Sequence, residues 1–377
     1  MPDSDPKDPA AWIRAELDSR GWRQRDLAFV LGVTEQSVTA LATGKRGISA
    51  EMAKALARVF DRSPEFILGL QKSSEIQMDL VRADEPSPDV ARRAKLVAGY
   101  PIREMVKRGW LTADNSTLEA QAARFFAVAN MDEKPTLPHL AKKSNYTEDV
   151  PAPQLAWLFR VKQIAERLIV PSYSESALRD AIPKLRALLT DPGDSARAPE
   201  ILNNCGIRFV VVEGLPGSRI DGVAFWLNGG KSPVIGMSLL HDRMDNFWFV
   251  LRHEIEHVLA RHNVETVNMD VELIVDKADV AGELPVEERE ANTAAADFCV
   301  PKAKMESFFA RKNPFFSEND IIGFSRLTKV HPSLVAGQIR NRTKRYDSFS
   351  KLMTKVRSAV TSAAVVDGWG ETYPIPS

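Results

Sequence analysis

The sequence predicts a multidomain protein in which an all-α region precedes an α+β region. The chain has 377 residues, more than one ordinary domain holds, so two or three folded units are expected. In the first third, apolar residues recur at helical spacing. Beyond Gln154, helical segments give way to short β-branched runs separated by Gly and Pro. The change of period places the boundary between the two fold classes near residue 153.

Proline and polar residues gather at two places, Asp84–Pro88 and Lys134–Pro153, as is typical of domain boundaries. Together with the helical and strand patterns they divide the chain into four segments. We expect a first domain over residues 1–72, a helical linker region over 73–153, a larger domain over 154–345 and a C-terminal tail over 346–377.

The local patterns predict individual elements within these segments. Residues 9–72 have the spacing of five short helices, and helical spacing returns at 90–106 and 118–129. In the second half we expect helices at 154–168 and 175–189 and strands at 207–212, 222–227 and 234–237. A strongly amphipathic helix then follows over 246–261, with Asp245 as its cap, and another helix begins near Pro285.

Composition narrows the class of protein and its compartment. Fifty basic residues balance fifty acidic ones, so any binding to nucleic acid must come from a local basic surface. Two isolated cysteines, Cys205 and Cys299, favour a reducing compartment over a disulfide framework. The first residues lack the pattern of a secretory signal, and no apolar run is long enough for a membrane span. We expect a cytoplasmic protein without a membrane partner.

A helix-turn-helix pattern occupies residues 24–38. Two helices that cross closely need a small residue at the crossing, a glycine at the turn and a β-branched residue where the second helix packs back. The chain supplies these types at Ala28, Gly32 and Val38, and Gln24 lies four positions before Ala28.

Thr34 is placed to cap the second, recognition helix, whose exposed N-terminal side would read base edges in the major groove. The candidate base-reading residues are Gln36, Ser37 and Thr39, next to Glu35. A rim of cations suited to phosphates is formed by Arg23, Arg25, Lys45 and Arg46. A helical bundle that binds a protein instead of DNA is the alternative interpretation.

This run, Gly21–Val38, with Thr43–Ala53 and Ser63–Gln71, resembles the phage-repressor (XRE) type helix-turn-helix of HigA-like antidote proteins. The resemblance covers about the first 72 residues. It implies binding to a double-stranded DNA operator as a homodimer, commonly to autoregulate a toxin–antitoxin operon.

A candidate metal site lies in the helix predicted over 246–261, which contains His253-Glu254-x-x-His257. Residues four apart share a helix face, so both imidazoles can reach one ion. Glu254, beside the first histidine, can address a metal-bound water as general base. Zinc is the ion expected for this pattern.

The third ligand must come from elsewhere, because positions 260 and 263 are Ala and Asn. The helix that begins near Pro285 offers Glu290, which shares a face with the small Ala294 and could approach the first helix closely. Glu287 is the competing choice from spacing.

The second half resembles the ImmA/IrrE-type metallopeptidases over roughly residues 155–345. The resemblance is carried by the His-Glu-x-x-His motif, by Glu290-Ala291-Asn292 and by Pro301. It implies a zincin-like fold with His253, His257 and Glu290 as zinc ligands and Glu254 as general base. Glu256 and Ala294 depart from the family pattern, and an altered pocket would affect peptidase activity more than metal binding.

Two functions remain open. In the first, the protein is a transcriptional regulator whose second domain is a zinc-dependent endopeptidase acting on a repressor, a toxin partner or the chain itself. In the second, it is a repressor or antitoxin whose metallopeptidase-like domain only senses a ligand or holds a partner.

Overall fold

A computed structural model describes residues 9–70, 89–135, 150–261, 268–271 and 285–373. The chain divides into two compact units, Met1–Pro135 and Thr136–Ser377. The first is helical and the second combines helices with a sheet, as the sequence predicts. Among the described residues, no helix combines the length and the apolar composition needed to cross a membrane.

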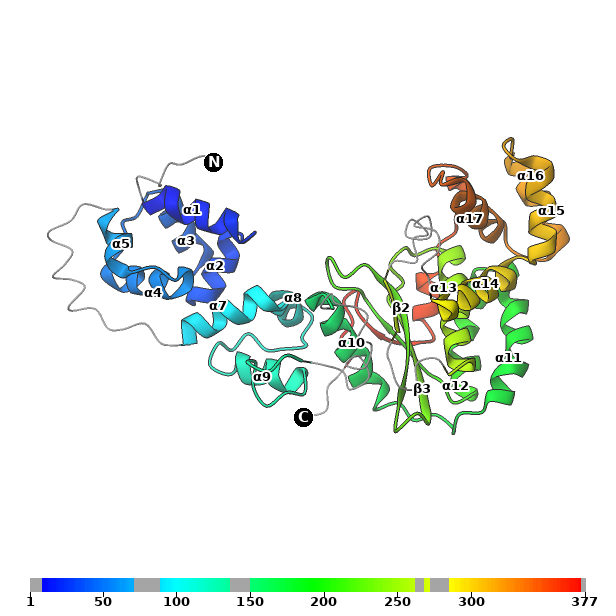
Figure 1. The fold of residues 1–377 in the computed structure, drawn as a ribbon, viewed down its shortest axis with the longest axis horizontal. Helices are drawn as coiled ribbons and strands as arrows, with labels where there is room; N and C mark the ends of the chain where they lie inside the picture. Colours follow the sequence, from blue (N-terminus) through cyan, green and yellow to red (C-terminus); the bar gives the residue numbers. More distant parts are fainter. Residues whose placement is uncertain (1–8, 71–88, 136–149, 262–267, 272–284, 374–377) are drawn as a thin grey trace. The chain divides into compact units, whose positions relative to one another are not determined.

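The first unit begins with the five helices predicted over residues 9–72 (Figure 1). They are α1 (Pro9–Ser19), α2 (Gln24–Leu31), α3 (Glu35–Ala42), α4 (Ala50–Phe60) and α5 (Pro64–Gly69). Trp12 is buried at their centre and meets Phe60 and Phe66 edge to face, with ring centroids 5.3 and 5.9 Å apart. Such aromatic pairs stabilise a core beyond the area they bury.

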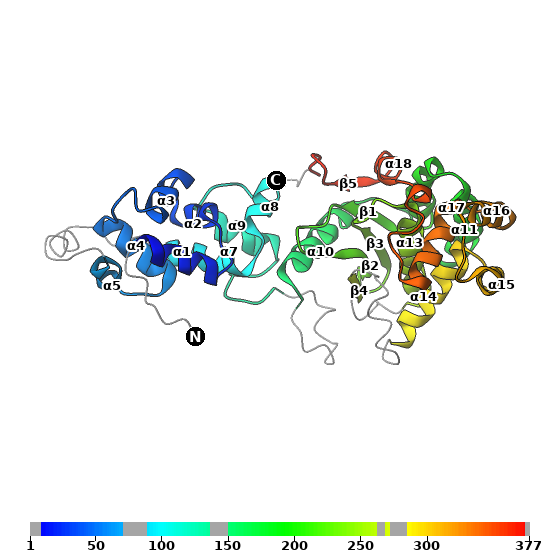
Figure 2. The ribbon, with the colours of Figure 1, turned by 90° about the horizontal axis from the view of Figure 1, so that it is seen from above.

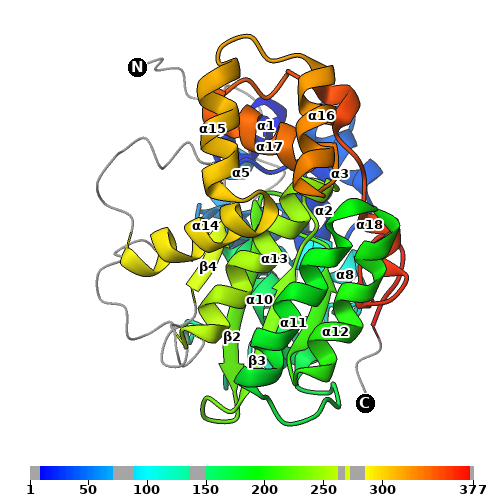
Figure 3. The same cartoon turned by 90° about the vertical axis from the view of Figure 1, so that its right-hand side faces the viewer.

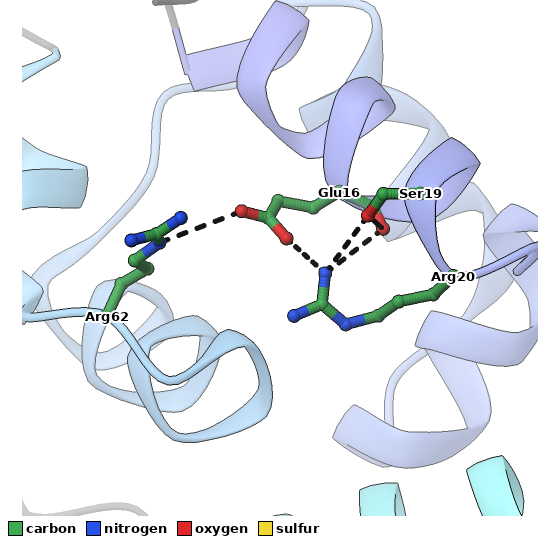
Figure 4. Close-up of polar contacts among 4 residues, drawn as sticks. All are labelled: Glu16, Ser19, Arg20 and Arg62. Atoms are coloured by element: carbon green, nitrogen blue, oxygen red, sulfur yellow. Dashed lines mark hydrogen bonds and ion pairs between the residues drawn. The ribbon is translucent and has the colours of Figure 1, made fainter.

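A polar cluster joins the end of α1 to the turn after α4 (Figure 4). The Arg20 guanidinium binds the Glu16 carboxylate one turn earlier, and Arg62 Nε lies 3.8 Å from the other Glu16 oxygen. Arg20 also donates to Ser19 Oγ at 3.3 Å. Because the Arg62 side chain is 56% exposed, we expect this cluster to contribute less than the aromatic packing beside it.

The described residues of the first unit also form α7 (Asp89–Gly99), α8 (Ile102–Lys107) and α9 (Leu118–Phe125). Val90 and Ala94, one turn apart on α7, are buried in the same core as α2 and α4. An Arg103–Asp26 ion pair ties α8 to α2. The predicted linker region 73–153 is therefore corrected over residues 89–135, which extend the first unit. The Asp84–Pro88 cluster lies outside the described residues.

The second unit is built on a five-stranded sheet with the order β4-β2-β3-β1-β5. The centre of the sheet confirms the three predicted strands. β2 pairs antiparallel with β3 and β4, and β1 pairs parallel with β3 and β5. The strands are β1 (Arg208–Val212), β2 (Ile220–Leu227), β3 (Ser232–Met237), β4 (Asn268–Val271) and β5 (Val365–Asp367).

Helices cover both faces of this sheet (Figures 1 and 2). Two glycines show which helix lies on which face. A Cβ at Gly236 on β3 would lie 2.7 Å from Val161 on α10, and one at Gly222 on β2 would lie 2.7 Å from Val250 on α13. The α-helices are α10 (Ala152–Ala165), α11 (Glu175–Ala187), α12 (Ala198–Asn204), α13 (Met244–Leu259), α14 (Val286–Cys299), α15 (Lys302–Lys312), α16 (Glu318–Thr328), α17 (Pro332–Thr343) and α18 (Arg357–Thr361). The described residues of the unit also form the 3-10 turns η2 (Leu188–Thr190), η3 (Gly193–Arg197) and η5 (Ser350–Leu352).

Helices α13 and α14 pack against each other along their length (Figure 3). Both appear close to the predicted places, but the predicted cap of α13 is wrong. Arg243 occupies the N-cap position, and Asp245 lies inside the first turn, where it binds the Arg243 guanidinium at 3.0 and 3.1 Å.

The predicted tail 346–377 is also corrected, because its described residues complete the second unit. β5 adds a strand to the sheet beside β1. Asp367 on β5 is fully buried and forms an ion pair with the equally buried Arg160 of α10. Arg160 Nη2 also donates to the Tyr373 carbonyl at 2.7 Å, and the Trp369 amide donates to Glu213 Oε2 at 2.7 Å. The described residues of the predicted tail therefore bind to their own domain.

Candidate nucleic-acid interface and candidate metal centre

The recognition helix α3 begins as predicted. The Thr34 hydroxyl accepts a hydrogen bond from the Ser37 amide at 3.3 Å, which caps the helix. Gly32 has φ of 70°, the left-handed conformation that a glycine adopts without strain. Val38 is fully buried and fixes α3 against α2. The sequence pattern and the local backbone agree here.

The predicted DNA-binding side chains lie on the solvent side of this motif. Ser37 is half-buried, with its hydroxyl 2.9 Å from Thr34 Oγ1. The exposed ones are Arg23, Arg25, Thr34, Gln36, Thr39, Lys45 and Arg46. The basic rim and the polar face of α3 are therefore both accessible to a partner.

Gln24 has a second role that sequence reasoning missed. Its Oε1 accepts a hydrogen bond of 2.6 Å from Thr39 Oγ1, across the two helices. The sequence pattern includes Gln24 by its spacing and gives it no further role. The contact fixes the rotamer of Thr39, which is one of the candidate base-reading residues.

The second candidate site centres on α13, which carries both histidines on one face. His253 and His257 are fully buried, and their Nε2 atoms lie 2.9 Å apart. Glu288 of α14 brings its carboxylate to the same point, with Oε2 3.3 Å from His253 Nε2 and Oε1 3.6 Å from His257 Nε2. Two imidazoles and one carboxylate are thus gathered from two helices.

These three groups match the donor set and the dimensions of a zinc site. Zn–N and Zn–O bonds of about 2.1 Å in a tetrahedron place ligand atoms about 3.4 Å apart. The separations of 2.9, 3.3 and 3.6 Å lie around that value. The residues therefore fit the ion in number, type and spacing.

The structure does not bring the predicted third ligand, Glu290, to the two histidines. Glu290 and its competitor Glu287 are both exposed, whereas Glu288 is half-buried and faces the histidines. Ala291 and Ala295 are buried three and seven residues after Glu288, so this is the face of α14 that packs on α13. Glu290 follows Glu288 by two residues, a helix rotation of about 200°, so the two side chains point in nearly opposite directions.

Asn292 supports the site from the next turn of α14. Its Oδ1 lies 3.1 Å from His253 Nδ1. An amide oxygen only accepts, so Nδ1 is the donor in this contact, and Nε2, the atom that faces His257 and Glu288, is the nitrogen that can offer its lone pair to an ion. Such a contact fixes the tautomer and the ring orientation of a metal-binding histidine. The sequence motif includes Asn292 but does not indicate this role.

The electrostatics favour an ionised carboxylate at this site. Burial opposes ionisation of Glu288, but hydrogen bonds from His253 and His257 outweigh it and hold the pKa of the carboxyl well below its usual range. Glu288 is therefore a carboxylate near neutral pH.

Glu254 lies on the sheet side of α13 and is fully buried. Its carboxylate lies over the backbone of Gly222 on β2, where a Cβ would be only 2.7 Å from Glu254 Oε1. The absence of a side chain at Gly222 provides the space for this carboxylate. The sequence analysis assigns no role to this glycine.

The two departures from the family pattern do not occupy the site. Glu256 pairs with Arg252, with its carboxylate 2.6 Å from Nη2, and is not among the groups that converge with the histidines in the described residues. Ala294 is half-buried on α14 and adds no bulk.

Comparison with known proteins identifies the first unit. Residues 13–67 match the family described as Helix-turn-helix. The chain is 38% identical over 88 residues to virulence-associated protein A' of Dichelobacter nodosus, an alignment that covers 23% of this chain and 73% of the relative. No solved structure matches the chain.

The motif geometry and these similarities define a DNA-binding regulator of the helix-turn-helix class. Within that class, the chain belongs to the family that includes the Dichelobacter nodosus protein.

Proposed function

We propose that this DNA-binding regulator carries a zinc-dependent endopeptidase in its second unit, which cuts a protein partner or a repressor. One observation carries the proposal. His253, His257 and Glu288 converge from two helices at metal-ligand spacing, and a buried glutamate follows the first histidine on the same helix.

The roles follow from the positions of the side chains. His253, His257 and Glu288 would hold the ion, and Asn292 would keep His253 in the tautomer that binds it. A bound zinc ion supplies Lewis-acid polarisation of the scissile carbonyl and lowers the pKa of water. Among the described residues three ligands converge, and a zinc ion held by three protein ligands would keep a fourth position for water, as in catalytic zinc sites.

Glu254 would perform the proton transfer. As a carboxylate it accepts the proton of the attacking water at an Oε atom, and it then returns that proton to the leaving amine. The packing against Gly222 holds this side chain in one orientation, which reduces the cost of ordering it for each reaction.

The first unit would direct this activity to an operator. The resemblance to HigA-like antidote proteins supports an antitoxin-like role, with binding as a homodimer and a toxin as protein partner. In this scheme, cleavage of the partner or of a repressor changes the occupancy of the operator.

A second candidate function is supported by a separate observation. His253, Glu254 and His257 have no exposed surface in this structure. A site enclosed in this way also suits a domain that holds a metal for architecture, or that senses a ligand, without hydrolysing a peptide bond.

Glu254→Gln separates the two functions. Glutamine keeps the size of the side chain but cannot accept a proton at neutral pH. Wild-type and E254Q chains would be expressed in the same host, and new protein N-termini would be quantified by mass spectrometry. We expect termini that are present with the wild type and reduced about 100-fold or more with E254Q. Identical sets of termini, with equal metal content in both proteins, would support the non-catalytic function.

A further inference from the structure

The second unit carries a strongly basic segment that the proposed peptidase does not use. Between residues 342 and 355 the chain has five Lys or Arg residues and one acidic residue, Asp347, in a protein whose charges balance at fifty each. This segment joins α17 to α18 (Figure 3). We define four of its cations as the α17–α18 basic surface: Arg342, Arg345, Lys351 and Lys355.

All four of these side chains are exposed. Among the described residues, none of the four forms an ion pair with a carboxylate. Arg342 lies over the Phe309 ring, with its guanidinium 5.5 Å from the ring centroid, and a cation stacked in this way keeps its charge available. The backbone around them is fixed, because Phe349, Leu352 and Met353 pack against the core of the unit.

A structural role explains only part of this charge. Cations in the last turn of a helix interact favourably with the helix dipole, which accounts for Arg340 and Arg342 on α17. Lys351 and Lys355 lie beyond the end of α17, outside the range of that effect. Of the two other arginines in the region, Arg340 is buried and Arg357 pairs with Asp242. Arg345, Lys351 and Lys355 are therefore left without a structural partner among the described residues.

We propose that the α17–α18 basic surface is a second DNA contact, which binds phosphates of duplex DNA outside the segment read by α3. Duplex DNA carries one negative charge about every 1.7 Å of its axis, so any length that extends beyond the recognition site offers a continuous row of phosphates. DNA bound to the first unit is held at a high effective concentration for a surface on the same chain. Lys and Arg on a mainly irregular segment suit phosphate contacts, which position a protein without reading sequence.

The proposal predicts a change in the salt dependence of binding. A plot of log affinity against log salt concentration has a negative slope, and each phosphate contact makes it steeper by about 0.9 for B-form DNA. The full-length chain and its R345E/K351E/K355E variant would be titrated with a mixed-sequence duplex several helical turns long, over a series of KCl concentrations. We expect the slope of the variant to be smaller by up to about 2.7, because three cations no longer bind phosphates.

Matched variants keep the test specific. K184E/R197E/K231E makes the same change of charge at exposed positions elsewhere in the second unit. It should leave the slope unchanged, and R345A/K351A/K355A should reproduce the effect without introducing acidic groups. Circular dichroism would show that every variant is folded.

Two results would overturn the proposal. If R345E/K351E/K355E and K184E/R197E/K231E have equal slopes, the net charge of the protein determines the salt dependence and the α17–α18 basic surface makes no specific contact with DNA. A wild-type slope in R345E/K351E/K355E, combined with loss of its retention on immobilised poly-glutamate, would assign the surface to an acidic protein instead of DNA.

Discussion

Gly222→Ala tests whether the absence of a side chain at Gly222 on β2 positions Glu254 of α13. The new Cβ would lie 2.7 Å from Glu254 Oε1 and 2.7 Å from Val250 Cγ1, whereas unstrained contacts between such atoms are about 3.5 Å or longer. Both side chains are buried, so they or the helix must move by almost 1 Å. Overpacking of this kind costs about 1–3 kcal/mol of folding free energy.

The assay is urea unfolding of the full-length chain, with Gly323→Ala as the matched control. Gly323 lies in α16 with no atom within 4 Å of a Cβ, so alanine there should stabilise the helix by about 0.5–1 kcal/mol. We expect a lower midpoint for G222A and an equal or higher one for G323A.

A double-mutant cycle assigns the cause. In an E254A background the cost of Gly222→Ala should fall, because one of the two clashing groups is removed. An equal cost in both backgrounds, or a G222A protein as stable as wild type, would refute the positioning of Glu254 by Gly222.

Three further predictions concern contacts elsewhere in the molecule. Asp367→Ala leaves the buried Arg160 cation unpaired and should cost about 3–5 kcal/mol in urea unfolding; a cost below about 1 kcal/mol would contradict a buried pair. Burial raises the pKa of Tyr173 to about 12, whereas the unfolded chain loses this proton near pH 10. The neutral phenol therefore contributes its full share of the folding free energy below pH 10, and this share is lost as the pH rises towards 12. Between neutral pH and about pH 11, the free energy of unfolding should fall less in Y173F than in the wild type, because phenylalanine has no proton to lose. Gln24→Ala removes the partner of Thr39 and should weaken discrimination between DNA sequences, measured by competition between duplexes, while the salt slope stays unchanged.

The helix-turn-helix could be predicted almost completely from the sequence, because its signals are local. A cap, a glycine at the turn and a buried valine lie within a few residues of one another, and the structure places Thr34, Gly32 and Val38 accordingly. The role of Gln24 could not be predicted from one sequence, because it depends on how α2 and α3 cross.

The residues of the candidate metal centre could be predicted on one helix and not on the other. His253 and His257 share a face by spacing alone, wherever the helix begins. The third ligand depends on which face of α14 packs against α13, and the sequence of α14 offers Glu287, Glu288 and Glu290 within four residues. Burial of Ala291 and Ala295 decides for Glu288, and this information exists only in the packed structure.

The end of the chain could not be predicted for a different reason. β5 has three residues, too few for a periodic pattern, and it joins the sheet beside a strand more than 150 positions earlier in the chain. The Arg160–Asp367 pair that anchors it spans 207 positions. Neither residue carries a local sign of its partner.

Metal analysis of the purified full-length protein tests the central claim most directly. Zinc would be measured per chain in the wild type and in H253A, E288Q and E290Q, all purified in the same way. Structural zinc sites bind with roughly 10–16 kcal/mol over four ligands, so loss of one ligand should weaken binding by about 3 kcal/mol or more, at least about 100-fold. The account predicts about one zinc per chain in the wild type and in E290Q, and little or none in H253A and E288Q. Zinc lost from E290Q and retained in E288Q, or no zinc bound by the wild type, would contradict it.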